Sequence, residues 1–82
     1  MPYIKPEKRP GLNKVVKEME VANVVADGDL NYILFKLCRE TVNPSYQGYK
    51  NFIAELTECA AEIRRRFLAP YEDQKIQING DV

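Results

Sequence analysis

Histidine is absent from this sequence of 82 residues. Any mechanism that needs an imidazole base, an imidazole metal ligand or a Ser–His or Cys–His pair is therefore excluded. An excess of charge is also missing, because 12 basic and 12 acidic residues give a formal net charge of zero. The chain thus lacks the overall cationic field expected of a protein that binds nucleic acid or an anionic membrane. With 45% hydrophobic and 29% charged residues, the composition is typical of one small globular domain.

Long hydrophobic runs are absent as well. The longest, Tyr32 to Phe35, is far short of the roughly 20 residues that span a bilayer, and the first residues contain no apolar signal-peptide segment. Only two cysteines occur, Cys38 and Cys59, whereas a secreted domain of this size usually carries several disulfides. Both lie in apolar, helix-like segments, so we expect buried, reduced thiols. We accordingly expect a cytoplasmic protein that does not contact membranes.

Alternating strand patterns are missing, and apolar residues instead recur at helical spacing. The first such segment covers about residues 12–26. The turn Asp27-Gly28-Asp29 follows it and is predicted to stop the helix. Gly28 is suited to a left-handed conformation there, and either aspartate can cap the next helix.

Two further helical segments follow. The second, about residues 30–42, is apolar on two faces, which is typical of a central helix packed on two sides. Pro44 breaks it, because the residue before a proline disfavours the α conformation. The third, from the N-cap Ser45 to about Ala69, has the clearest division into an apolar and a charged face.

Prolines are predicted to shape both ends of the chain. The first ten residues contain three of them, Pro2, Pro6 and Pro10. This spacing predicts an extended arm over residues 1–10. Pro70 is expected to end or kink the third helix and to occupy the first position of a short helical tail, which ends before Gly80.

Together these elements predict an all-α fold, a small three-helix bundle with an extended, proline-rich N-terminal arm and a short C-terminal helical tail. Residues 1–10 form the arm and residues 11–82 a single helical domain. A chain of this size buries only about 60% of its unfolded surface, too little to cover a central helix with two apolar faces. We therefore expect self-association through the second and third helices, in its commonest form a twofold dimer.

Three glutamates, Glu55, Glu58 and Glu62, share one ridge of the third helix at spacings of three and four. Joined by an acid from another segment, they could hold Mg²⁺ and serve the hydrolysis of nucleotides or phosphate esters. The same spacing also predicts a solvated face on which Glu62 pairs with Arg65 or Arg66 one turn further on. The sequence favours the solvated face and keeps the metal site as an alternative.

Basic residues concentrate in two places. Arg64 to Arg66 are predicted at the C-terminal end of the third helix, where cations suit the negative end of the helix dipole. Residues 3–17 carry a net charge of +4 and residues 18–29 a net charge of −4. This polarity favours an electrostatic contact within or between subunits at least as well as a nucleic-acid patch.

The two ends of the chain carry recognisable motifs. It opens with Met-Pro-Tyr-Ile-Lys (residues 1–5) and closes with Pro-Tyr-Glu-Asp (70–73) and Asn-Gly-Asp (79–81). With these motifs the sequence resembles a family of short uncharacterised proteins from prokaryotes and their phages. The resemblance spans nearly the whole chain and implies that residues 70–82 belong to the domain. It implies no activity, ligand or catalytic residue.

The predicted function is therefore that of a non-catalytic, homo-oligomeric interaction or accessory protein without a cofactor. Its expected partners are a second copy of the chain and an unidentified protein. One alternative is a Mg²⁺-dependent hydrolase that uses Glu55, Glu58 and Glu62. Another is nucleic-acid binding through the basic N-terminal arm, against which the zero net charge argues.

Overall fold

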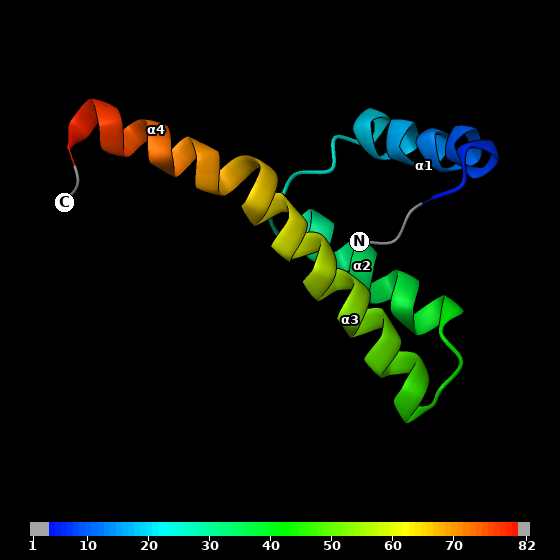
Figure 1. Ribbon diagram of the computed structural model, residues 1–82. Coiled ribbons are helices and arrows are strands. Elements are labelled where there is room, and N and C mark those ends of the chain that lie inside the picture. Colours follow the sequence, from blue (N-terminus) through cyan, green and yellow to red (C-terminus); the bar gives the residue numbers. More distant parts are fainter. Residues whose placement is uncertain (1–3, 81–82) are drawn as a thin grey trace. The chain divides into compact units, whose positions relative to one another are not determined.

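The computed structural model describes residues 4–80 (Figure 1). All regular structure in this range is helical, with no strand, which confirms the predicted all-α class. The elements are η1 (Pro6–Lys8), α1 (Arg9–Val21), α2 (Gly28–Thr41), α3 (Tyr46–Ile63), η2 (Arg64–Leu68) and α4 (Ala69–Asn79). They form two units, one ending at Pro44 and one beginning at Ser45, and each is described by itself.

The first unit begins with helical structure where an extended arm was predicted. Pro6 is the first residue of the 3-10 helix η1, and Pro10 is the second residue of α1. Proline is tolerated there because the first amides of a helix have no partner within it. The predicted extended conformation is therefore wrong for residues 6–10, although Lys5 is extended. Residues 1–3 of the predicted arm lie outside the described residues.

Helix α1 ends at Val21, earlier than predicted, in a Schellman motif. Asn23 adopts a left-handed conformation with φ 57°. Its N–H donates to the carbonyl of Glu20, and the N–H of Val24 donates to the carbonyl of Met19, both at 3.0 Å. Asparagine tolerates this conformation, and the β-branched residues that follow have low helix propensity, so the chain leaves the helix here.

Helix α2 is capped as predicted by an aspartate of the turn. The Asp27 carboxylate accepts a hydrogen bond from the N–H of Asp29 at 2.9 Å, and the Asp29 carboxylate accepts one from the N–H of Val25 at 3.3 Å. Gly28 is the first residue of α2, so the left-handed conformation predicted for it is wrong. The helix ends just before the extended Val42, close to the predicted boundary.

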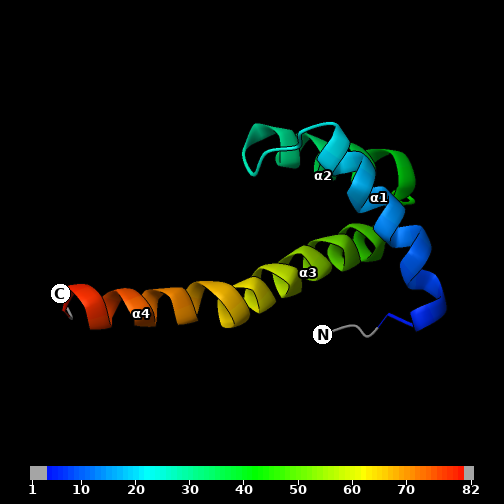
Figure 2. The same cartoon turned by 90° about the horizontal axis from the view of Figure 1, so that it is seen from above.

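The second unit is one long helix that bends gently (Figures 1 and 2). Ser45 caps it as predicted, since its hydroxyl accepts a hydrogen bond from the N–H of Gly48 at 2.9 Å. In the π-helical segment η2 the N–H of Ala69 donates to the carbonyl of Arg64, five residues back. The wider turn accommodates Pro70, which has no N–H, so the proline does not end the helix.

The C-terminal tail is therefore a direct continuation of the third helix. Its predicted limit is confirmed, because Gly80 follows the last residue of α4 with φ 84°, a conformation that suits glycine.

Neither unit encloses a hydrophobic core. Within residues 4–80 no side chain is fully buried. The least exposed residues are only half-buried, namely Met19, Val24, Leu30, Ile33, Leu34, Cys38, Val42, Gly48, Phe52 and Glu62. The helices are present as predicted, whereas neither unit by itself forms the packed core of a bundle within the described residues. Completion of the bundle by dimerisation stays a prediction.

Candidate interaction surfaces

Helix α2 presents apolar side chains on two faces, in agreement with its sequence pattern. On one face Tyr32 and Phe35 are 62% and 66% exposed. On the opposite face Leu30 and Ile33 are half-buried, and Leu37 is exposed. The helix predicted to be central thus has uncovered apolar surface, which is the usual mark of a protein–protein contact.

The long helix of the second unit carries a longer apolar stripe. The residues predicted to face inward along it are Tyr49, Phe52, Ile53, Leu56, Cys59, Ala60, Ile63 and Phe67. Of these only Phe52 is half-buried, and Phe67 is 67% exposed. The π turn takes one residue more than an α turn, so residues four apart lie closer to one face there. Ile63, Phe67 and Tyr71 therefore continue the stripe from α3 into α4.

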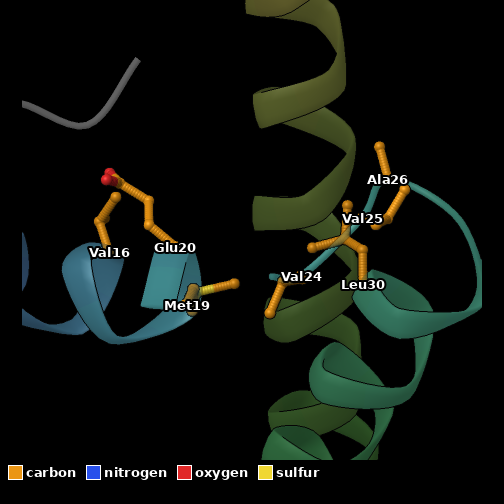
Figure 3. Close-up of a pocket in the computed structure, with 7 residues that line it drawn as sticks. All are labelled: Val16, Met19, Glu20, Val24, Val25, Ala26 and Leu30. Carbon is orange, nitrogen blue, oxygen red and sulfur yellow. The ribbon is translucent and has the colours of Figure 1, made fainter. Parts of the chain in front are cut away.

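A small apolar pocket is lined by the end of α1, the segment that connects α1 to α2, and the first turn of α2 (Figure 3). Its volume is about 280 Å³. Its lining residues are Val16, Met19, Glu20, Val24, Val25, Ala26 and Leu30. The Schellman motif at Asn23 ends α1 before the lining residues Val24, Val25 and Ala26, which therefore lie outside the helix. Predicting α1 through Ala26 concealed this pocket, and Asn23 is the residue that signals it.

The three candidate metal-binding glutamates lie on α3 as predicted, but they do not act together. Glu62 pairs with Arg65 and with the Nε atom of Arg66, the latter at 2.6 Å, which confirms the predicted pairing. Glu55 and Glu58 make no ion pair with residues of the described range. Among residues 4–80, no three cysteine, aspartate or glutamate side chains are placed to hold a metal ion. The Mg²⁺ alternative, which needs an acid from another segment or copy, stays a prediction.

The ion pairs change the acidity of Glu62. The hydrogen bond from the Arg65 guanidinium holds the pKa of the Glu62 carboxyl below its usual range, and the hydrogen bond from Arg66 acts in the same direction. Partial desolvation of the carboxyl opposes these effects without cancelling them. Glu62 is therefore a carboxylate fixed to its own helix by two arginines.

The arginine cluster occupies a different place from the predicted one. Arg64 to Arg66 form most of η2, in the middle of the long helix, and α4 continues to Asn79. The interpretation that these cations stabilise a helix C-terminus is therefore wrong, because the helix does not end there. Arg64 makes no ion pair with any residue of the range 4–80, so its charge is available to another molecule.

Four exposed aromatic rings each have a cation four residues further along the same helix. The pairs and ring-centroid distances are Lys36 over Tyr32 at 5.8 Å, Arg39 over Phe35 at 5.7 Å, Lys50 over Tyr46 at 5.7 Å and Lys75 over Tyr71 at 5.6 Å. Distances below about 6 Å are typical of cation–π contacts. The spacing of four is the sequence signal from which these pairs could have been predicted.

The two cysteines are free thiols. Cys38 is half-buried, whereas Cys59 is exposed, so the prediction of a buried thiol is wrong for Cys59 in the single chain. Within the described range, no helix combines the length and the apolar character needed to cross a membrane.

These features define a small all-α protein whose described surface is rich in exposed apolar and aromatic side chains. The chain belongs to the family described as Domain of unknown function (DUF6899), whose family model matches residues 1–82. This match agrees with the resemblance to an uncharacterised family and covers the C-terminal residues that the resemblance assigned to the domain. Searches of curated proteins and of solved structures gave no match.

Proposed function

We propose that this protein is a non-catalytic interaction protein that works as a homo-oligomer, in which the apolar helix faces of the copies cover one another. One observation carries the proposal: no residue between 4 and 80 is fully buried, although every α-helix exposes large hydrophobic side chains. Burial of such side chains supplies most of the free energy that folds a small domain. The described residues of a single copy bury little apolar surface and so gain little of this free energy.

The lack of internal burial is clearest in the second unit. It consists of one long helix, and no other element of that unit packs against it. Isolated helices are marginally stable in water, so a helix with an exposed apolar stripe acquires its stability by packing on something else. Another copy of the chain is always available for this at equal concentration.

Charge favours a second copy over an unrelated partner. The chain is neutral overall, yet its charges are segregated into a basic stretch at residues 3–17 and an acidic stretch at residues 18–29. A surface that carries both signs can be complementary to itself in a twofold contact. We further propose that the protein acts in the cytoplasm of prokaryotic or phage-infected cells, as composition and motifs suggest.

The test is the mass of the purified chain in solution, measured by sedimentation velocity and light scattering across the micromolar range. We expect a multiple of 9.5 kDa. Because association stabilises the folded state by mass action, the melting temperature should also rise with protein concentration. A helical species that stays monomeric, with a melting temperature independent of concentration, would overturn the proposal.

A further inference from the structure

The long helix extends beyond what the rest of its own chain can cover. Its segments α3, η2 and α4 contain 18, 5 and 11 residues, which corresponds to about 51 Å of helix. Helices α1 and α2 contain 13 and 14 residues, each about 20 Å long. Even placed end to end, these two helices would be shorter than the long one. Part of its apolar stripe therefore needs cover from another molecule, whatever the arrangement of the two units.

The C-terminal half of this helix carries the most exposed part of the stripe. Ile63, Phe67, Tyr71 and Ile78 are 50%, 67%, 57% and 74% exposed. They follow one another through η2 and α4. Large apolar side chains exposed in a row are typical of an interface.

The charges around this segment are arranged symmetrically about Ala69. Three arginines, Arg64 to Arg66, precede it, and two acids, Glu72 and Asp73, follow it. In an antiparallel pair of helices centred on residue 69, positions equally far from residue 69 face each other. Each arginine cluster is then placed beside the acids of the other copy. A parallel pair in register would instead bring six arginines together, and like charges in contact are unfavourable.

The same register pairs the aromatic residues. Phe67 and Tyr71 lie two residues on either side of position 69, so the Phe67 ring of one copy meets the Tyr71 ring of the other. Aromatic pairs add to the free energy gained from apolar burial alone. Arg64 and Glu72 are each free of ion pairs with the described residues of their own chain. They come within two residues of facing each other, about 3 Å along the helix axis, which two long side chains can span.

We propose that residues 60–79 pair in antiparallel orientation with the same segment of a second copy. Phe67 packs on Tyr71 of the second copy, and the Arg64 side chain reaches Glu72 of the second copy. This inference rests on the proposed homo-oligomer and identifies its interface, its orientation and its register.

The orientation is tested by distances between spin labels in the oligomer. Cys38 and Cys59 are replaced by alanine, and a single cysteine is introduced by Leu68→Cys, Ala61→Cys or Gln77→Cys. In the proposed pair Leu68 flanks the contact one residue from its centre, so its label is about 10 Å from its copy, the usual spacing of packed helices. The labels at positions 61 and 77 are each at least about 24 Å from their copies, because each is separated from its copy along the axis at 1.5 Å of rise per residue. A parallel pair in register adds no separation along the axis, so all three distances stay below about 20 Å.

The register is tested by exchanging charges. We expect R64E alone and E72R alone to weaken self-association roughly tenfold at low salt, because each brings like charges within reach of each other twice per dimer. The double variant R64E/E72R restores the affinity of the natural chain. The matched control, K50E, reverses a charge outside the segment and leaves the affinity unchanged.

The outcomes separate this inference from the proposed function. A monomeric natural chain overturns both. Three results overturn the antiparallel interface and leave the homo-oligomer standing: short distances at all three positions, a long distance at position 68, or no rescue in the double variant.

Discussion

The backbone N–H of Val24 donates a hydrogen bond to the carbonyl oxygen of Met19, five residues back and 3.0 Å away, and this bond closes the C-terminus of α1. Both side chains are half-buried and line the apolar pocket at the junction with α2. Contact between these two positions is the usual companion of a Schellman motif. The backbone turn and the small apolar cluster beneath it therefore stabilise each other.

The residue that makes this turn possible is Asn23, with φ 57°. Asn23→Val places a β-branched side chain in the left-handed conformation and should lower the free energy of unfolding by about 1–2 kcal/mol. Asn23→Gly removes the steric cost and should leave the stability unchanged or higher. Chemical denaturation followed by circular dichroism measures both. Equal stability of the two variants would contradict a left-handed Asn23.

The N-cap of the long helix offers a second test. The hydroxyl of Ser45 accepts a hydrogen bond from the N–H of Gly48, so Ser45→Ala should cost about 1 kcal/mol of stability. Thr57→Ala is the matched control, since the Thr57 hydroxyl donates to the carbonyl of Ile53 within the helix and contributes no cap. Alanine there has the higher helix propensity, and the control should not destabilise. Thermal denaturation measures the stability of both variants. If Thr57→Ala is as destabilised as Ser45→Ala, the loss in Ser45→Ala does not come from the N-cap hydrogen bond.

The sequence correctly predicted those features of the structure that depend on interactions between residues close together in the chain. The caps at Asp27 and Ser45 and the pairing of Glu62 with Arg65 and Arg66 all involve residues two to four positions apart. Such contacts follow from helical periodicity alone. The all-α class follows from the same periodicity.

The errors occurred where one residue can serve two conformations. Pro6 and Pro10 are compatible both with an extended arm and with the first turn of a helix. In the structure each lies in the first turn of a helix. The left-handed conformation that ends α1 was predicted at Gly28, but it occurs at Asn23. Burial was predicted least well, because the exposure of Cys59 and of the apolar stripe depends on what packs against them and not on the pattern along the chain.

The π-helical segment η2 gives a third prediction. Pro70 lacks the N–H that an α-helix would use to reach the Arg66 carbonyl, and the wide turn before it avoids that loss. Pro70→Ala restores the donor and should convert η2 to α-helix, raising stability by roughly 1–3 kcal/mol. Slower amide hydrogen exchange around residues 66–71 measures the change.

Pro10→Ala provides the control for this substitution. Pro10 lies in the first turn of α1, where an amide has no partner within the helix, so its replacement should change stability little. If the two proline variants behave alike, η2 does not owe its π turn to Pro70.

The lowered pKa of Glu62 leads to a dependence of stability on pH. Its main cause is the hydrogen bond from Arg65, which stabilises the carboxylate in the folded chain. A carboxyl whose pKa is lower when folded contributes stability that is fully present above its unfolded pKa, about 4.3 for glutamate. This contribution is lost as the pH falls through the lower pKa of the folded state.

We therefore expect Glu62→Gln to be less stable than the natural chain at pH 7 and to approach it in stability in strong acid. Glu58→Gln, which removes a carboxyl without an ion pair among the described residues, is the control and should show no such convergence. Denaturation at a series of pH values measures both variants. In parallel, a carboxyl titration followed by NMR should show the pKa of Glu62 rising toward the ordinary value in Arg65→Ala. An ordinary glutamate pKa for Glu62 in the natural chain would mean that the two arginines do not hold the carboxylate in solution.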